Sequence, residues 1–433
     1  MKKGQKLYRK AKKIILGGNM LFSKRPELFL PDHWPTYYSK AKGTYVWDLE
    51  NKKYLDMICT PGPNILGYSN NEIDKEVVKY LKKGNMTTFN CPEEVELARK
   101  ITKIHPWSKM VKFARSGGEA NAISIRIARA ASKKDKIAVC GYHGWHDWYL
   151  SINLSGKDKL KGHLLPGLNP NGVPKNLNQT VFPFQYGDIE GLEKILKRND
   201  IGTIKLEVAR YTKPNVNFLK EVRKIADKKK IVLIFDECTT GFRRNFGGLH
   251  LTTGVEPDMA MFGKAIGNGY AINAIIGKKK VMQAAEDSFI SSTFWTERVG
   301  YIAANTTLDL MKKLKPWENL INMGKLFKEG CLNIAKKHNI NLRVTGIDTI
   351  NYLNFEKNKN QIYKTFITQE MLKAKILASN VIYLNIFHKE KHIKIYLKEL
   401  DKIFKKIKKI ELNGSVKSKL KGPVSHDTFK RLN

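Results

Sequence analysis

The sequence has few cysteines and no long apolar run, and both scarcities limit what the protein can be. Its five cysteines are widely spaced and never form Cys-x-x-Cys, so we expect a reducing cytoplasm and no structural zinc. No stretch approaches about 18 uninterrupted apolar residues, which predicts that no segment spans a membrane. The basic N-terminal stretch also has too short an apolar run for a signal peptide.

Acidic residues are the third scarcity. The chain has 40 Asp and Glu against 78 Lys and Arg, which gives a net charge of +38. Such a basic chain could bind nucleic acid or another anionic polymer. However, lysine greatly outnumbers arginine and is spread along the chain, whereas nucleic-acid surfaces concentrate arginine. We therefore interpret the charge as a lysine-rich solvated surface, with an anion- or nucleic-acid-binding protein as the remote alternative.

Short apolar runs alternate with helical patterns from about residue 112 to 276, which predicts a mostly parallel sheet flanked by helices. A mixed pattern follows, with helices near 368–378 and 391–408, as in a smaller α+β domain. The predicted strands of the larger domain are Ile137–Cys140, Ile204–Glu207, Ile231–Asp236, Met259–Phe262 and Ile272–Ile276. We expect three parts: an N-terminal segment (1–55) that packs with the small domain, a large domain (56–311) and a small C-terminal domain (312–433).

One of these runs ends in an ionisable residue, and another is followed closely by one. Asp236 closes Ile231–Asp236, and Lys264 follows Met259–Phe262 directly. Open α/β sheets build their sites at the carboxyl ends of strands, so we expect both side chains at one edge. A lysine there can form a Schiff base with pyridoxal phosphate (PLP), while the carboxylate keeps the pyridine nitrogen protonated. Alone, Asp236 could cap a helix and Lys264 could lie on the surface, but the apolar sequence around both favours buried stems.

A Ser-Gly-Gly turn, Ser116 to Gly118, separates a strand end at Phe113 from a helix that begins near Glu119. Glycines let the backbone approach an anion, and the free N–H groups and the helix dipole then bind it. We expect Ser116, Gly117 and Gly118 to form a cup for a single phosphate. The alternative is that Ser116 caps the helix and that the turn has no further role.

Tyr142 and His143 follow the predicted strand Ile137–Cys140. An aromatic ring at this point could stack on a flat heteroaromatic cofactor, and Tyr142 is the candidate, with His143 beside it. The pair His143 and His146 could suggest a metal, but no carboxylate or cysteine completes a ligand set at the usual spacing. We therefore expect no metal site.

Together these segments resemble the class III aminotransferases, which are fold-type I PLP enzymes, and most of all their glutamate-1-semialdehyde 2,1-aminomutase-like branch. The resemblance extends from about residue 22 to 410. It implies an α/β fold with a large domain, whose mostly parallel sheet is flanked by helices, and a smaller α+β domain. Four segments match in the family's order: Ser116-Gly-Gly-Glu-Ala, Tyr142-His-Gly, Asp236-Glu-Cys-Thr-Thr-Gly-Phe-Arg and Phe262-Gly-Lys-Ala-Ile-Gly-Asn-Gly.

The resemblance implies roles for the residues around the cofactor ring. Lys264 would be the Schiff-base lysine and the general base that moves the substrate α-proton. Asp236 would pair with the pyridinium, and Tyr142 would stack on the ring with His143 beside it. Glu207 would lie near the cofactor hydroxyl, although Glu207-Val-Ala-Arg replaces the family's Glu-Pro-Val segment and leaves that contact open.

The resemblance also covers the cofactor phosphate. Gly117 and Gly118 would bind it through backbone amides, although Gly118 stands where the family has a hydroxyl residue. In the family a threonine of the neighbouring subunit also contacts the phosphate, and Thr293 fits that position. A homodimer with both sites at its interface is therefore implied.

A further departure concerns the substrate. Phe294-Trp-Thr-Glu-Arg replaces a small Gly-Asn-Pro turn, which must reshape the wall that faces substrate. Arg298 and Arg210 are candidate clamps for a substrate carboxylate, with structural ion pairs as the alternative. We therefore expect a ping-pong aminotransferase that moves an amino group from an amino donor to an aldehyde or keto acceptor through the Lys264 Schiff base. Isomerisation of glutamate 1-semialdehyde to 5-aminolevulinate is the alternative.

Overall fold

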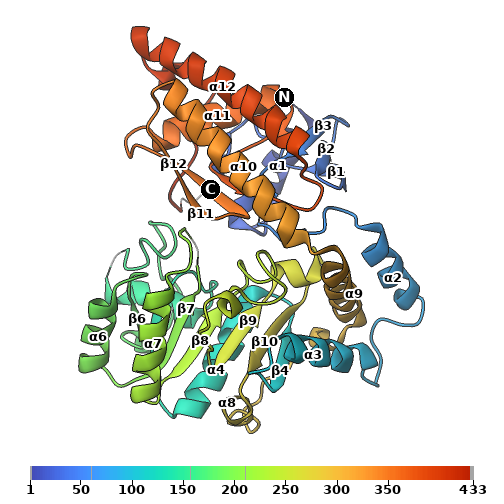
Figure 1. Cartoon of the computed structure of the whole chain (residues 1–433), viewed down its shortest axis with the longest axis vertical. Coiled ribbons are helices and arrows are strands. Elements are labelled where there is room, and N and C mark those ends of the chain that lie inside the picture. The colour runs from blue at the N-terminus through green and yellow to red at the C-terminus, as the bar shows by residue number, and fades with distance from the viewer. Residues whose placement is uncertain (1, 60, 157, 210, 430–433) are drawn as a thin grey trace. The chain divides into compact units, whose positions relative to one another are not determined.

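The computed structural model describes residues 2–59, 61–156, 158–209 and 211–429, and Figure 1 shows the chain. It divides into two compact units, Met1–Asn70 with Pro316–Asn433, and Asn71–Lys315. The domain boundaries drawn from the sequence, at 55/56 and 311/312, stay predictions. Within the described ranges, every helix is too short or too polar to cross a lipid bilayer.

The unit over Asn71–Lys315 is built on a seven-stranded sheet in the order β4-β10-β9-β8-β7-β5-β6. Neighbours from β9 to β6 run parallel, while β10 runs antiparallel to both β9 and β4. Because β10 alone is reversed, the carboxyl ends of the other strands meet at one edge of the sheet. The strands are β4 (Met110–Ala114), β5 (Lys136–Cys140), β6 (Val181–Pro183), β7 (Ile201–Glu207), β8 (Val232–Asp236), β9 (Met259–Phe262) and β10 (Asn273–Gly277).

Helices pack against this sheet and the mostly parallel arrangement that the sequence predicted is confirmed (Figure 1). Helix α4 lies across β4, β7, β8, β9 and β10, and α7 contacts β8. Ile123 and Ile127 of α4 join Val139, Ile234 and Met261 in a buried cluster. Burying each such side chain stabilises the fold by about 1.5–3 kcal/mol. The longer helices are α2 (Asn71–Leu81), α3 (Pro92–Ile104), α4 (Gly117–Ser132), α6 (Ile189–Arg198), α7 (Val216–Lys228) and α9 (Arg298–Leu314).

The other unit is the smaller α+β assembly. A four-stranded sheet has the order β1-β2-β3-β13, and a three-stranded sheet has the order β11-β12-β14. Strand β3 pairs in parallel with β13, which joins the N-terminal segment to the C-terminal part of the chain. The strands are β1 (Tyr38–Lys42), β2 (Tyr45–Asp48), β3 (Lys53–Asp56), β11 (Leu342–Ile347), β12 (Ile350–Phe355), β13 (Ile376–Leu377) and β14 (Val381–Tyr383). The helices are α1 (Lys3–Ile14), α10 (Pro316–Lys337), α11 (Asn360–Lys373) and α12 (Glu390–Asn413).

Candidate active site

The direction of the strands brings most of the predicted site residues to one edge of the large sheet. Strands β4, β5, β7, β8 and β9 all end there, and β10 begins there with Asn273 paired to Ala114. The residues that close or follow these strands are, in chain order, Ser116, Gly117, Gly118, Tyr142, His143, Glu207, Asp236 and Lys264. Five separate segments of sequence therefore converge where open α/β sheets bind their ligands.

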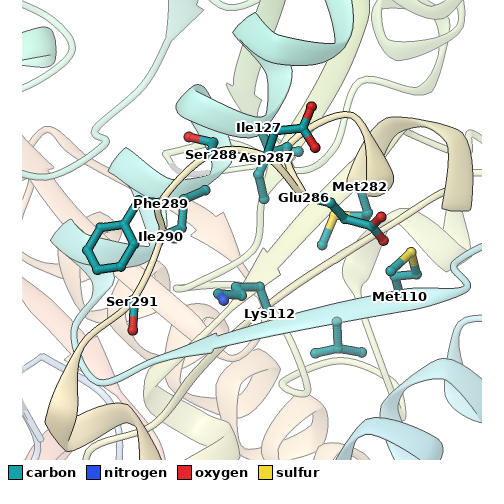
Figure 2. Close-up of a pocket in the computed structure, with 12 residues that line it drawn as sticks. Met110, Lys112, Ile127, Met282, Glu286, Asp287, Ser288, Phe289, Ile290 and Ser291 are labelled. Atoms are coloured by element: carbon teal, nitrogen blue, oxygen red, sulfur yellow. The ribbon is translucent and has the colours of Figure 1, made fainter.

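A pocket of about 510 Å³ lies elsewhere on the same unit (Figure 2). Met110 at the start of β4, Ile127, Met282 and Ser291 are among the residues that line it. None of its lining residues is one of the predicted site residues. The converging side chains at the carboxyl edge, rather than this pocket, define the candidate active site.

Helix α4 begins after β4 with a capping box. The Ser116 hydroxyl accepts a hydrogen bond from the Glu119 N–H at 3.4 Å, and the Glu119 carboxylate accepts one from the Ser116 N–H at 2.7 Å. Ser116 is therefore a helix cap, as the alternative proposed. The cap is compatible with a phosphate cup, because it uses the N–H of Glu119 whereas a phosphate would take those of Gly117 and Gly118.

Two aromatic rings take the space beside Gly118. A Cβ atom at this position would lie 2.9 Å from His146 Cε1 and 3.0 Å from Trp145 Nε1, so a larger residue needs one of the rings to move. The rings stack with their centroids 4.3 Å apart. His146 Nδ1 is shielded from solvent and has no hydrogen-bond partner in the described part of the chain. The sequence had suggested His146 only as a metal ligand, whereas the structure places an unpaired ring nitrogen at the cup.

Asp236 closes β8 and is almost fully buried. Its Oδ2 lies 2.9 Å from His143 Nδ1, and its Oδ1 accepts from the Cys238 N–H at 3.1 Å. His143 Nε2 lies 3.2 Å from the Cys140 carbonyl, so the imidazole donates to both acceptors only when each ring nitrogen carries a proton. Burial raises the pKa of Asp236, but the His143 hydrogen bond and the Lys205 charge outweigh it and lower the pKa to about 2. The carboxylate therefore stays ionised.

Lys264 begins a short turn after β9 and has a φ of +46°, in the left-handed region. That conformation costs a residue with a Cβ about 1–2 kcal/mol, so the surrounding structure must impose it. The Nζ atom donates to Thr239 Oγ1 at 2.8 Å. The residue is half-buried rather than enclosed, which leaves its amine within reach of a ligand at the sheet edge. Because Thr239 follows Asp236 by three residues, the same loop positions both groups.

Glu207 closes β7 and supports the loop that carries Tyr142. Its Oε2 accepts from the Tyr142 N–H at 2.9 Å. The loop approaches the carboxylate at Gly141, which has a φ of +110° and where a Cβ would lie 2.5 Å from that oxygen. Only glycine allows this approach. The Tyr142 side chain is 39% exposed, so one part of the ring is open to a ligand.

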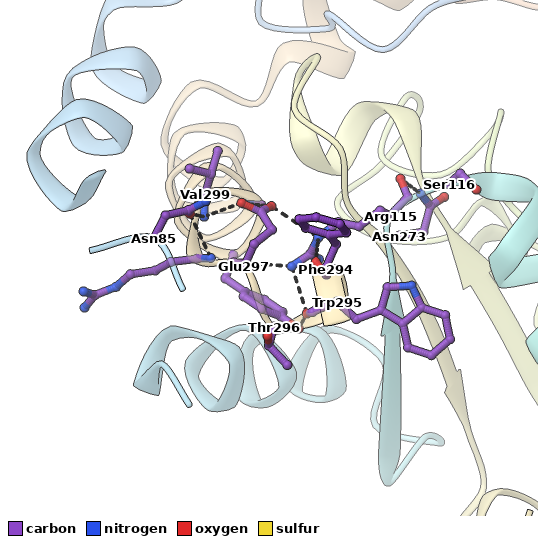
Figure 3. A network of polar contacts seen from close by, with 12 residues as sticks. Asn85, Arg115, Ser116, Asn273, Phe294, Trp295, Thr296, Glu297 and Val299 are labelled. Atoms are coloured by element: carbon purple, nitrogen blue, oxygen red, sulfur yellow. Dashed lines mark hydrogen bonds and ion pairs between the residues drawn. The ribbon is translucent and has the colours of Figure 1, made fainter. Parts of the chain in front are cut away.

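Thr293 begins an exposed turn, Thr293–Thr296, that Arg115 ties to the cup (Figure 3). Trp295 Nε1 adds a contact to Glu119 Oε1 at 3.3 Å. The Arg115 guanidinium donates to three backbone carbonyls of this segment, those of Phe294 at 2.9 Å, Trp295 at 2.9 Å and Glu297 at 2.6 Å. Since Arg115 directly precedes Ser116, the turn is fixed to the loop that opens α4.

Comparison of the whole sequence with known protein families gives one clear match. The family model for class-III aminotransferases matches residues 31–410. This chain belongs to the class-III aminotransferase family. It is 32% identical over 374 residues to the 3-aminobutyryl-CoA aminotransferase of Cloacimonas acidaminovorans (strain Evry), which covers 84% of this chain and 86% of that protein. It is 31% identical over 430 residues to the glutamate-1-semialdehyde 2,1-aminomutase of Wigglesworthia glossinidia brevipalpis, which covers 93% and 98%.

Solved structures show that this class-III aminotransferase has the fold-type I architecture. The FumI protein of Sphingopyxis sp. MTA144, solved with PLP, has a TM-score of 0.86 at 23% identity and covers 96% of this chain and 99% of its own. A glutamate-1-semialdehyde aminomutase from Pseudomonas aeruginosa PAO1 has a TM-score of 0.82 at 16% identity and covers 93% and 94%. The predicted fold class and the PLP cofactor are confirmed. The protein is a PLP-dependent transaminase or a closely related aminomutase.

The residues of this chain fit the cofactor. The ionised Asp236 suits a pyridinium, and the half-buried Lys264 suits a cofactor carbonyl. The start of α4 offers amides and a helix dipole to a phosphate, and His146 Nδ1 beside it is a buried polar atom in need of a partner. The donor set thus has one element each for the pyridine nitrogen, the carbonyl and the phosphate of PLP.

Arg298, a candidate substrate clamp, forms an ion pair within its own chain. Its Nε and NH2 groups bind the two oxygens of Glu93 at 2.9 and 2.6 Å, and its guanidinium lies 4.8 Å from the centroid of the Tyr80 ring. Glu93 is only 7% exposed, and this ion pair occupies the Nε side of the guanidinium. The structure therefore contains the ion pair that was the alternative, and a substrate clamp at Arg298 stays a prediction. Arg210, the other candidate, lies outside the described residues.

A buried network holds the loop between Asp236 and His250. His250 Nδ1 lies 2.8 Å from the Glu237 carboxylate, and Trp107 donates to His250 Nε2 at 3.0 Å. His105 Nε2 accepts from the Gly248 N–H at 2.9 Å. Glu237 also accepts hydrogen bonds from the backbone N–H groups of Leu249 and His250 and from the Thr240 hydroxyl. This network fixes the loop that bears Thr239, the hydrogen-bond partner of Lys264.

Protonation of His105 is expected to destabilise this network at low pH. Burial and the neighbouring His250 lower the pKa of His105 from 6.5 to about 4, against the opposing effects of the Ile101 carbonyl and Glu237. Between these values the unfolded chain binds a proton that the folded chain does not. The free energy of unfolding should therefore fall as pH is lowered from 6.5 towards 4, by about 3 kcal/mol from this residue. Urea unfolding across that range measures the slope. The His105→Gln variant should have a flatter slope, and an unchanged slope would refute the assignment.

Proposed function

We propose that this protein is a ping-pong aminotransferase that moves an amino group from an amino donor to an aldehyde or keto acceptor, with Lys264 as the covalent anchor of PLP. The observation that carries the proposal is the convergence of Lys264, the ionised Asp236 and the phosphate cup at one sheet edge, in a chain of the class-III aminotransferase family. Bound PLP withdraws electrons from the substrate α-carbon and so makes its proton acidic.

Each catalytic group of the chain has a separate role in the proposed reaction. Once the substrate amine has taken its place on the cofactor, the free Lys264 amine would move the proton from the substrate α-carbon to the cofactor's carbonyl carbon, and the Thr239 hydroxyl 2.8 Å away would orient that amine. Asp236 keeps the cofactor's pyridine nitrogen protonated. His143 holds the Asp236 carboxylate in place from 2.9 Å and supports its ionised form.

The remaining residues hold the cofactor. Gly117 and Gly118 bind its phosphate through backbone amides, and the unpaired His146 Nδ1 is a further phosphate contact that takes the place of the family's hydroxyl residue. Tyr142 stacks on the ring. Glu207, 2.9 Å from the Tyr142 N–H, fixes that loop and lies near the cofactor hydroxyl.

We also propose that the protein works as a cytoplasmic homodimer. Thr293 is exposed in its own protomer, so its hydroxyl is open to the phosphate of a partner's site. Phe89 and Phe289 are 87% and 85% exposed, and a partner subunit that covered them would bury both apolar rings. All five cysteines are free, which suits a reducing compartment.

Transfer between two substrates is favoured over isomerisation by the turn after Thr293. Phe294 and Trp295 are far bulkier than the Gly-Asn-Pro turn of the aminomutase-like branch, and Arg115 fixes their carbonyls at 2.9 Å. The wall that faces substrate therefore differs from that branch, while Asp236, Lys264 and Tyr142-His143 match it. Isomerisation of glutamate 1-semialdehyde stays the second candidate function, because a relative at 31% identity is named a glutamate-1-semialdehyde 2,1-aminomutase.

A half-reaction separates the two functions. The purified holoenzyme is mixed with single amino donors and no acceptor, and the keto product is quantified. An aminotransferase releases about one product molecule per active site and then stops until an acceptor is added. The Lys264→Ala variant should release none. Conversion of glutamate 1-semialdehyde to 5-aminolevulinate without any donor, together with no release from a donor panel, would overturn the aminotransferase proposal in favour of the aminomutase.

A further inference from the structure

A fully buried lysine lies in the middle of β7, and no catalytic or cofactor-binding role has been given to it above. All residues of β7 are buried, and Lys205 is 0% exposed. Its ammonium group makes no ion pair with any described residue; its polar contacts are to Ser124 Oγ at 3.0 Å and Met261 Sδ at 3.1 Å. Burying a charge in this way is costly unless another charge compensates it.

The register of the sheet shows where the ammonium lies. Glu207 pairs directly with Asp236, so Lys205, two residues earlier on β7, projects from the same face of the sheet as Asp236. Met261 on β9 is the other direct neighbour of Asp236. Lys205 itself is level with Ile234, and because β8 separates β7 from β9, its side chain reaches Met261 by crossing β8 between Ile234 and Asp236. Helix α4 covers this face and supplies Ser124.

We propose that Lys205 is a positioning residue for catalysis: its buried ammonium lies behind Asp236, keeps that carboxylate a poor proton acceptor, and so leaves the shared proton on the cofactor's pyridine nitrogen. The inference rests on the proposed function, because it needs PLP with its pyridine nitrogen at Asp236. Electrostatic attraction is strong at a site that water does not enter, and a cation beside a carboxylate favours its ionised form. The closer contacts of Asp236, to His143 and the Cys238 N–H, position the carboxylate, whereas Lys205 acts on it through its charge.

The charge on Lys205 is itself sensitive to pH. Burial lowers the pKa of Lys205 to about 8, while Asp236 and Cys238 oppose that shift. Burial raises the pKa of the Cys238 thiol well above its ordinary value, so that group stays neutral. Of the other elements packed around the ammonium, α4 presents the Ser124 hydroxyl and β9 presents Met261, neither of which titrates there. The support given to Asp236 should therefore disappear as pH rises through about 8.

The test measures the protonation state of the pyridine nitrogen. It uses the ¹⁵N chemical shift of ¹⁵N-labelled PLP bound to the holoenzyme at about pH 7 and about pH 9. The wild type should show a protonated nitrogen at the lower pH and a shift towards the unprotonated form at the higher one. Lys205→Met should show the high-pH form at both, and its kcat at the lower pH should be below that of the wild type. Lys205→Arg retains a charge throughout and should keep the protonated signal at both.

The outcomes decide between a tuning role and a structural one. Methionine replaces the buried charge with an apolar chain of similar length, so Lys205→Met should keep or raise the melting temperature. The same ¹⁵N shift and pH profile in the wild type and Lys205→Met would overturn the inference and leave Lys205 a packing residue. If Lys205→Met fails to fold, the wild type and Lys205→Arg still decide, since the inference requires a pH step in the first and its absence in the second. A wild type that takes up no PLP refutes the proposed function instead.

Discussion

Replacing Lys264 with alanine is expected to lower kcat by about ten-thousandfold or more while the protein stays folded. The variant loses both the covalent anchor of the cofactor and the amine that moves the substrate α-proton, and no other group at the sheet edge can supply either. Its stability should change little, because the side chain is half-buried and its amine makes a hydrogen bond to Thr239 alone among the described residues. Steady-state kinetics with the fastest amino donor of the wild type measures the loss.

The matched control is another lysine of the same unit. Lys279 is exposed at the start of α8 (Lys279–Gln283), away from the carboxyl edge of the sheet. Lys279→Ala should retain the kcat of the wild type. If Lys264→Ala keeps more than about a tenth of that activity, or loses no more than the Lys279 variant, Lys264 has no part in the chemistry.

Asp236→Asn should have the second-largest effect, a fall in kcat of roughly 10²- to 10³-fold. Asparagine has nearly the same shape but carries no charge, so it cannot hold a proton on the pyridine nitrogen, and the cofactor becomes a weaker electron sink. The variant also leaves the buried Lys205 without its compensating carboxylate, which should lower the melting temperature. Kinetics and thermal unfolding of the same samples separate the two effects.

Asp258 provides the comparison for this variant. It is also a buried carboxylate, paired with Arg223 at 2.9 Å and with Lys278 at 2.8 Å, but it precedes β9 and lies away from the site. Asp258→Asn should lower stability and leave kcat unchanged. Equal losses of kcat in Asp236→Asn and Asp258→Asn would mean that the first acts only through the fold.

The elements at the carboxyl edge of the large sheet could be predicted from the sequence, because the local sequence patterns that define them agree with one another. The apolar run that predicted a strand over Ile231–Asp236 is β8, Val232–Asp236, and Asp236 closes both. Helix α4 begins at Gly117, two residues before the expected Glu119, because Ser116 and Glu119 form a capping box. In such cases the residues that decide an element lie within a few positions of one another, and a pattern can detect them.

Features made by distant contacts could not be predicted in this way. The helix expected near 368–378 is α11, which ends at Lys373; Lys375 turns the chain with a φ of +60°, and β13 then pairs with β3 more than 300 residues earlier in the sequence. The partner of Arg298 is Glu93, which no local pattern connects to it.

Two residues to which we propose a function were missed for similar reasons. His146 lies beside Gly118 at the cup, and this contact depends on how two loops pack against each other. Lys205 left a visible signal, a single lysine inside an otherwise apolar strand, but its position behind Asp236 required the register of three strands. The chemistry of the site was thus readable from motifs, whereas its tuning was not.

The central claim is that Lys264 carries PLP, and the most direct measurement is to trap that attachment. The purified holoenzyme is reduced with borohydride, digested, and mapped by mass spectrometry. We expect the reduced cofactor on the peptide that contains Lys264, near full occupancy, with no label in Lys264→Ala. A label on another lysine, such as Lys205, or a protein that binds PLP under no condition, would contradict the account.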